Sequence, residues 1–304
     1  MSKKIIFFGN ERLATGVTTN NPVMNRLIEE GYEIDCLILN QESYNSRKLR
    51  TIEAEELAIK NNIKVFKPAS IQEVKEIILK SGTKLAVLVA YGKLIPESVI
   101  DMFPLGIINI HPSLLPDKRG STPIEQTILD GDKLSGVSLM KLTKGMDSGP
   151  IYDQIKIELS GKESKQELSE IMNIAGAEIL IKNLPDIMNG GIKTSEQANE
   201  GVTITKQISK NDGVIDWNQS SDMIERKSRA YKDWPKLKTT IFDQKVVVED
   251  VAIREPTKLK AGDIICDKDS LIIASSDKGI EILALRPENK NSMAAKAFIA
   301  GYKK

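Results

Sequence analysis

The chain contains a single histidine, His111, which follows an apolar run that is typical of a buried strand. Side chains alternate along a strand, so Asn109 points to the same face as His111. Imidazole is the side chain whose ordinary pKa lies nearest neutral pH, so it can take up and release protons during a reaction. Pro112 and Pro116 stiffen the loop that follows. The pair indicates a catalytic site, although a histidine that only makes structural hydrogen bonds fits the same pattern.

A carboxylate supplies the next candidate group. Asp147 lies between Gly145 and Gly149, in a loop expected to join a strand near 137–141 to a strand near 151–157. Glycine allows the backbone to come close to a ligand, so the loop suits a binding or reacting site. An aspartate in such a loop can instead accept hydrogen bonds from its own turn, and the sequence leaves both interpretations open.

Strands and helices alternate through the first half of the chain. Apolar runs predict strands at 5–8, 34–39, 64–66, 85–90 and 107–110, and helical patterns fall at 22–30, 52–61, 71–81 and 124–130. This alternation predicts an α/β fold with a Rossmann-like, mostly parallel sheet that has helices on both faces. Ligands bind beyond the carboxyl ends of the strands in such sheets, which is where His111 is expected.

The pattern changes after a long helical segment at 162–188, which Gly190 and Gly191 end. Residues 191–205 are polar and are interpreted as a linker. Short strands are then expected at 239–242, 245–253, 262–266, 271–274 and 280–285, which predicts a small, closed or half-closed, OB-like β-barrel. The predicted organisation is a catalytic domain at 1–190, a linker at 191–205 and a C-terminal β-barrel domain at 206–304.

The composition is that of an ordinary globular protein. Residues 1–205 carry 24 basic and 27 acidic side chains, whereas residues 206–304 carry 19 and 15. This asymmetry favours an anionic partner for the C-terminal part, and it also fits a chance imbalance.

Cys36 and Cys266 are far apart without another cysteine or a histidine nearby, so no metal site is expected. No stretch approaches the roughly 18 apolar residues that a membrane helix needs, and we expect a cytoplasmic protein.

Several segments together resemble a known family. The matching segments are Asn109-Ile-His-Pro-Ser-Leu-Leu-Pro116, Arg119-Gly120, Gly131-Asp132 and Met146-Asp147-Ser148-Gly149. In residue type and spacing they are similar to the signature of the 10-formyltetrahydrofolate-dependent formyltransferases. The resemblance implies transfer of a formyl group from 10-formyltetrahydrofolate, as a co-substrate, to an amine, and it requires no metal.

The same resemblance implies the roles of individual residues. Asn109 and a protonated His111 would stabilise the oxyanion that forms when an amine attacks the formyl carbon. Asp147 would hold His111 in its charged form and help to remove the proton of the amine, directly or through water. The predicted folate-binding residues are Ala90, Tyr91, Gly92, Leu94, Ser113, Leu114, Leu115, Pro116, Met140 and Asp147.

The second half of the chain indicates the acceptor. Lys206-Gln-Ile-Ser-Lys210, Ile215-Asp-Trp217 and Leu285-Arg-Pro-Glu-Asn-Lys290 resemble the C-terminal domain of the methionyl-tRNA branch of that family. The implied partner is initiator methionyl-tRNA, for translation initiation, and we expect a monomer. Lysine and arginine suit phosphate contacts, but each would also fit a solvated surface. The predicted tRNA-binding residues are Tyr44, Arg47, Lys48, Arg50, Lys206 and Lys210.

One motif departs from the family. The first turn usually reads Gly-Thr-Pro, whereas this chain has Gly9-Asn-Glu-Arg-Leu-Ala14 followed by an insertion-like segment at 15–21. That turn normally helps to receive the aminoacyl end, so the departure bears on the acceptor rather than on the catalytic residues. An amino sugar on a nucleotide is the alternative acceptor, and a binding module without catalysis is a third hypothesis. The turn also lacks Gly-x-Gly-x-x-Gly, which argues against a nicotinamide dinucleotide.

Overall fold

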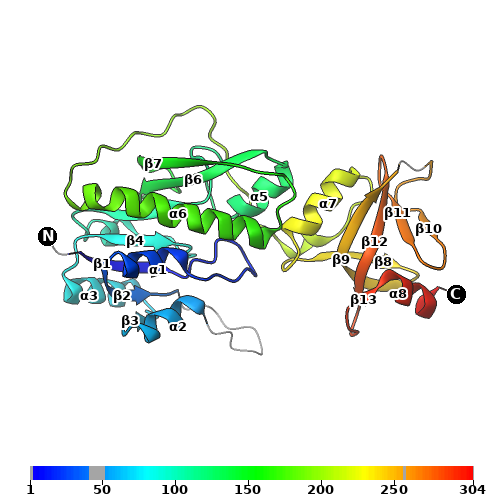
Figure 1. Cartoon of the computed structure of the whole chain (residues 1–304), viewed down its shortest axis with the longest axis horizontal. Helices are drawn as coiled ribbons and strands as arrows, with labels where there is room; N and C mark the ends of the chain where they lie inside the picture. Colours follow the sequence, from blue (N-terminus) through cyan, green and yellow to red (C-terminus); the bar gives the residue numbers. More distant parts are fainter. Residues whose placement is uncertain (1–2, 41–51, 256–257, 304) are drawn as a thin grey trace. The chain divides into compact units, whose positions relative to one another are not determined.

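The computed structural model describes residues 3–40, 52–255 and 258–303, and their contacts divide the chain into two compact units (Figure 1). Unit 1 comprises residues 1–124, 133–160 and 166–206. Unit 2 comprises residues 125–132, 161–165 and 207–304. The polar segment at 191–205 falls within unit 1. Within the described ranges, no helix is both long and apolar enough to cross a lipid bilayer.

Unit 1 is built on a seven-stranded sheet with the order β3-β2-β1-β4-β5-β6-β7. The strands are β1 (Lys4–Gly9), β2 (Glu33–Ile38), β3 (Lys64–Phe66), β4 (Ala86–Val89), β5 (Ile107–His111), β6 (Leu134–Lys141) and β7 (Ile151–Glu158). Strands β1 to β5 run parallel to one another, whereas β6 runs antiparallel to both of its neighbours, β5 and β7. The strand order reverses between β1 and β4, and such a reversal opens the crevice in which α/β proteins bind ligands. The predicted Rossmann-like sheet is confirmed.

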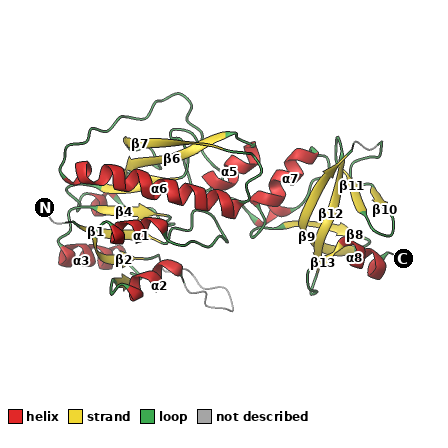
Figure 2. Ribbon diagram, in the orientation of Figure 1, coloured by secondary structure: helices red, strands yellow, loops and turns green. Residues whose placement is uncertain are grey.

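Helices cover both faces of this sheet (Figure 2). They are α1 (Pro22–Glu29), α2 (Glu53–Lys60), α3 (Ile71–Ser81), α4 (Glu97–Ile100) and α6 (Lys165–Met188), whereas α5 (Pro123–Asp130) falls mostly in unit 2. Ile6 and Phe8 of β1 share a core cluster with Val74 of α3, because alternate residues of a strand point to one face. On the other face Gly176 lets α6 approach β5, since a Cβ there would lie 2.7 Å from Ile110 Cγ2.

Unit 2 contains an antiparallel sheet with the order β10-β11-β12-β9-β8, in which β13 also pairs with β12. Its elements are η1 (Lys210–Gly213), α7 (Ser221–Ala230), β8 (Leu237–Ile241), β9 (Gln244–Arg254), β10 (Ile264–Cys266), β11 (Leu271–Ala274), β12 (Gly279–Pro287), β13 (Met293–Ala294) and α8 (Ala295–Tyr302). Register shifts between β9 and β12 allow the sheet to bend. Phe298 of α8 is fully buried and stacks on Phe242 and Tyr302. This half-barrel confirms the fold predicted for the C-terminal part.

Candidate active site

The three predicted catalytic side chains meet at the carboxyl end of β5. Asn109 Nδ2 donates a hydrogen bond to Asp147 Oδ1 over 3.4 Å, and His111 Nδ1 lies 3.7 Å from Asp147 Oδ2. Asn109 and His111 are 6% and 5% exposed, and the side chain of Asp147 is 17% exposed. The three groups therefore form one cluster that is nearly closed to solvent, with Asp147 as its most accessible member.

Strand β5 holds the backbone of Asn109 and His111 in place, because every residue of the strand is buried. Its register pairs Asn109 with Met140 and His111 with Ser138 of β6. On its other side Asn109 is paired with Leu88 of β4. Pairing with strands on both sides leaves the backbone little freedom, so the two side chains keep the same relative position.

The hydrogen bond of His111 Nε2 determines which ring nitrogen carries the hydrogen. Nε2 lies 2.9 Å from the backbone oxygen of Lys118. A carbonyl oxygen only accepts hydrogen bonds, so Nε2 carries a hydrogen and Nδ1 is the nitrogen without one in the neutral ring. Nδ1 is also the nitrogen that faces Asp147. The ring is therefore oriented with Nδ1 toward the carboxylate.

A tight turn presents Asp147 to the other two residues. Its φ of 44° lies in the left-handed region, which non-glycine residues keep only where the surrounding structure holds them. The backbone N–H of Gly120 donates to Asp147 Oδ2 over 2.8 Å. A Cβ at Gly149 would lie 1.9 Å from the backbone oxygen of Lys141, so only glycine fits where the loop enters β7. The glycines flanking Asp147 signalled this turn, whereas nothing in the local sequence signalled the Gly120 donor.

Comparison with protein-family models covers both units. The model described as formyl transferase matches residues 4–184, and the model of the formyl transferase C-terminal domain matches residues 207–303. The chain belongs to the formyl transferase family. The family indicated by the motifs around Asn109, His111 and Asp147 is thereby confirmed, and the protein is an enzyme of this family.

Curated members of the family match this formyl transferase over nearly their whole length. The methionyl-tRNA formyltransferase of Thermodesulfovibrio yellowstonii is 32% identical over 307 residues, which are 100% of this chain and 97% of the relative. The methionyl-tRNA formyltransferase of Bacillus cereus strain B4264 is 31% identical over 309 residues, which are 99% of this chain and 96% of the relative. The two alignments therefore span nearly the whole of this chain and of both relatives.

Solved structures share the fold of this formyl transferase at lower identity. HypX from Aquifex aeolicus in complex with tetrahydrofolic acid has a TM-score of 0.67 and 16% identity, over 99% of this chain and 47% of HypX. This chain thus spans about half the length of HypX. The N-formyltransferase from Helicobacter canadensis, in complex with folinic acid and dTDP-3-aminofucose, has a TM-score of 0.68 and 18% identity, over 93% of this chain and 99% of that one. At these identities the likeness establishes the fold alone.

The first group of predicted folate-binding residues follows β4. Segment Ala90–Gly92 forms a turn in which the first and last residues have φ values of 52° and 75°. Leu94 is 83% exposed, so its side chain is available to a ligand. A Cβ at Gly9 would lie 1.9 Å from the backbone oxygen of Val89, which shows that the end of β1 touches the start of this turn. The turn therefore lies where the strand order reverses, at the crevice expected for this sheet.

The second group follows β5 and is held by serine hydroxyls. Ser113 Oγ donates to the backbone oxygen of Asp117 over 2.6 Å. Ser138 Oγ donates to the backbone oxygen of Ser113 over 2.6 Å and accepts from the N–H of Leu115 over 3.0 Å. These bonds fix the loop directly behind His111.

Burial separates the members of this second group. Ser113 and Leu115 in this loop, and Met140 in β6, are at most 3% exposed, so their side chains offer little surface to a ligand. Leu114 and Pro116 are half-buried. A folate contact from this segment would therefore use Leu114, Pro116 or the backbone.

The departing first turn contains a buried acid, Glu11. It is 0% exposed, and its carboxylate accepts hydrogen bonds from the N–H groups of Val23 and Met24, both over 2.9 Å, at the start of α1. Burial raises the pKa of Glu11 to about 7, although the two hydrogen bonds lower it. The side-chain amide of Asn173 in α6 donates to the backbone oxygen of Glu11 over 2.8 Å. The turn is thus built around a carboxylate that caps a helix.

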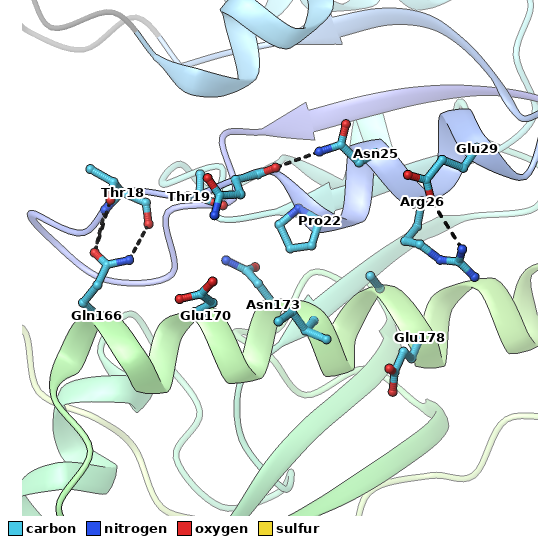
Figure 3. Close-up of a pocket in the computed structure, with 13 residues that line it drawn as sticks. Thr18, Thr19, Pro22, Asn25, Arg26, Glu29, Gln166, Glu170, Asn173 and Glu178 are labelled. Carbon is cyan, nitrogen blue, oxygen red and sulfur yellow. Dashed lines mark hydrogen bonds and ion pairs between the residues drawn. The ribbon is translucent and has the colours of Figure 1, made fainter.

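The insertion-like segment at 15–21 forms one wall of a groove of about 470 Å³ between α1 and α6 (Figure 3). Thr18 and Gln166 bond across one end of it, and Arg26 pairs with Glu29 at the other end. The residues that line the groove are Thr18, Thr19, Asn20, Pro22, Asn25, Arg26, Glu29, Gln166, Glu170, Asn173, Ile174, Ala177 and Glu178. None of them is a predicted site residue, so this groove is separate from the cluster of Asn109, His111 and Asp147.

The predicted tRNA-binding residues fall into two groups. Tyr44, Arg47, Lys48 and Arg50 lie outside the residues that the structure describes. Lys206 and Lys210 are exposed, and the hydroxyl of Thr122 donates to the backbone oxygen of Lys206 over 2.9 Å. Over the described part of the chain, no three His, Cys, Asp or Glu side chains are grouped closely enough to hold a metal ion.

Proposed function

We propose that the protein transfers the formyl group of 10-formyltetrahydrofolate to the free amino group of methionine on initiator tRNA. The extent of the match carries this proposal: both family domains are present, and relatives of nearly equal length are named methionyl-tRNA formyltransferase. The fold alone does not select the acceptor, because a structural neighbour is an N-formyltransferase with dTDP-3-aminofucose bound. Formylation of an amino sugar on a nucleotide is therefore the alternative to exclude.

The catalytic proposal for Asn109 and His111 is stabilisation of an oxyanion. An amine that attacks the formyl carbon produces a tetrahedral centre with a negatively charged oxygen. Asn109 has a second amide N–H besides the one facing Asp147, and a protonated His111 has an N–H at Nδ1. The distances of 3.4 and 3.7 Å to the carboxylate exceed the roughly 2.9 Å of a strong bond, so neither donor is fully engaged. Both can serve the oxyanion.

The catalytic proposal for Asp147 is acceptance of the amine proton, directly or through one water. It is the most exposed member of the cluster, and a carboxylate has more acceptor sites than the bonds from Gly120 and Asn109 occupy. N10 of the folate takes up a proton as its bond to the formyl carbon breaks. The reaction therefore forms one C–N bond, breaks another and releases no net proton.

The folate is proposed to bind over the turn after β4 and the loop after β5. The exposed side chain of Leu94 and the half-buried Leu114 and Pro116 offer apolar surface on these two segments. The positive φ values at Ala90 and Gly92 turn the backbone there, which makes its polar groups available to a ligand. These groups suit a flat heterocycle that needs both apolar contacts and hydrogen bonds.

The C-terminal domain at 206–304 is proposed to bind tRNA. Its excess of basic side chains suits a phosphate backbone, and Lys206 and Lys210 at its start are exposed. The basic segment with Tyr44, Arg47, Lys48 and Arg50 is proposed as a second contact, in which Tyr44 stacks on a base. The enzyme is proposed to act as a monomer in the cytoplasm.

A formylation assay with two acceptors tests the proposal. Protein and 10-formyltetrahydrofolate are incubated with charged initiator methionyl-tRNA or with an amino-sugar nucleotide. We expect formyl-methionyl-tRNA with the wild type and with Asn61→Ala, a change at an exposed residue that follows α2, but not with Asn109→Ala. Product from the amino-sugar nucleotide alone would replace the proposed acceptor. Binding of folate and tRNA by the wild type without product would instead indicate a binding module.

A further inference from the structure

The polar segment before the C-terminal domain is an ordered strap against the catalytic loops. We define the strap as residues 195–205. At one end the N–H groups of Ser195 and Ile151 each donate to the other's backbone oxygen over 2.8 Å. At the other end the N–H of Arg119 donates to Thr203 over 3.0 Å, and that of Thr205 donates to Arg119 over 2.8 Å. The strap is thus paired with β7 and with the loop at 116–122.

Within the strap, Gln197 and Thr205 are the two residues that are not exposed. The side-chain amide of Gln197 donates to the backbone oxygens of Asp147 and Gly149 over 2.7 and 2.8 Å. Its oxygen accepts from Nε and Nη2 of Arg119 over 3.0 and 2.7 Å. Both the nitrogen and the oxygen of the Gln197 amide are therefore hydrogen-bonded. Because the Arg119 guanidinium only donates, the amide oxygen must face Arg119 and the amide nitrogen must face Asp147.

The contacts of Gln197 bracket the strained turn at Asp147. A residue at φ 44° keeps that conformation only when neighbouring groups hold it, and Gln197 bonds the backbone on both sides of Ser148. The strap also supports the other contacts of the cluster. Thr203 Oγ1 accepts from the N–H of Lys118 over 2.7 Å, and Lys118 in turn holds His111 Nε2 through its backbone oxygen.

We infer that Gln197 is a positioning residue for formyl transfer, which acts by fixing Asp147 against His111. The inference rests on the proposed function of the catalytic cluster. Gln197 touches no reacting atom, because its hydrogen bonds end on backbone oxygens and on Arg119. A shift of a catalytic group by about 1 Å can lower a rate about 100-fold, so loss of this amide should act on turnover rather than on substrate binding.

A double-mutant cycle in the full chain tests the inference. Gln197→Ala should lower kcat about 10- to 100-fold and leave KM for both substrates within about twofold. In an Asp147→Asn background the same change should alter kcat by less than about twofold, because the residue through which Gln197 acts is already disabled. Gln72→Ala, at an exposed position of α3, is the control and should match the wild type in both backgrounds.

A second readout needs no substrate. His111 is the only histidine, so selective labelling gives one set of imidazole resonances. Gln197→Ala should shift these resonances at fixed pH, and the shift should vanish in the Asp147→Asn background. If Gln197→Ala does not fold, Gln197→Glu keeps the shape and the Arg119 contact while turning an oxygen toward the two carbonyls, and it carries the same expectations.

The outcomes separate this inference from the proposed function. Wild-type kcat and unchanged His111 resonances in the Gln197 variants would overturn the inference, as would equal losses in both Asp147 backgrounds. If the wild type formylates an amino-sugar nucleotide instead of tRNA, the proposed acceptor is wrong, and the cycle is run with that acceptor. If the wild type formylates neither acceptor, the proposed function fails, and the resonances of His111 still decide whether Gln197 positions Asp147.

Discussion

Glu11 gives a pH response whose sign follows from its surroundings. Its carboxyl group is fully buried, and burial raises its pKa from 4.5 to about 7 despite the hydrogen bonds from Val23 and Met24. Between about pH 4.5 and pH 7 the folded protein therefore holds a proton at Glu11 that the unfolded chain has released. The contribution of Glu11 to the free energy of unfolding should therefore fall as pH rises through this window and level off above about pH 7.

The size of the effect follows from the pKa change. A rise from 4.5 to about 7 corresponds to about 3 kcal/mol, because each factor of ten in an equilibrium constant is worth about 1.4 kcal/mol. Glu11→Gln keeps the shape of the side chain and removes its titration. The free energy of unfolding of the wild type minus that of Glu11→Gln should thus decrease by about 3 kcal/mol between about pH 4.5 and pH 8.

Urea unfolding at several pH values measures this difference. The pH-dependent contributions of the titrating groups that both proteins share cancel in it. Circular dichroism is the probe, because both tryptophans, Trp217 and Trp234, lie in unit 2 and their fluorescence does not follow unit 1. Glu76→Gln, the same substitution at an exposed position of α3, is the matched control against which the pH dependence of Glu11→Gln is read. A pH-independent difference for Glu11→Gln would refute the reasoning, since the group would then ionise alike in both states.

Three further predictions concern packing, chemistry and the acceptor. Gly176→Val should lower the free energy of unfolding of unit 1 by about 1–3 kcal/mol, because the new side chain meets Ile110; an unchanged urea midpoint would show that α6 moves aside without cost. Asp147→Asn should lower the single-turnover rate about 100-fold with folate affinity unchanged, and a rate within about threefold of the wild type would remove it from proton transfer. Charge reversal at Lys206 and Lys210 should raise KM for tRNA about tenfold and weaken its salt dependence with kcat unchanged; steady-state kinetics at two salt concentrations would detect no change if neither lysine contacts phosphate.

The sequence predicts the sheet and the catalytic cluster for the same physical reason. Apolar strands that alternate with helices have few ways to bury their side chains other than a parallel sheet, and a parallel sheet gathers the carboxyl ends of its strands. His111 and Asn109 follow directly from this rule because they lie on the last residues of β5. Asp147 is brought to them by the pairing of β5 with β6, while its flanking glycines already marked a turn.

The strap and the burial of Glu11 could not be predicted, because local sequence patterns do not reveal the interactions on which they depend. The strap at 195–205 shows no apolar periodicity in its sequence. It is held instead by backbone hydrogen bonds and by the side chains of Gln197, Thr203 and Thr205. Glu11 is a charged residue type in a polar stretch, and its burial depends on α1 and α6, which come later in the chain. In both places the partners lie far apart in sequence, so spacing gave no signal.

The cluster of Asn109, His111 and Asp147 is proposed to move a formyl group onto methionine bound to initiator tRNA. This role is tested by the single-turnover rate of formyl-methionyl-tRNA formation by His111→Ala and by the wild type, with tRNA and folate binding measured on the same samples. We predict a rate at least about 100-fold lower in the variant, with both affinities within about twofold. Formation of the product by His111→Ala at the wild-type rate would contradict the claim.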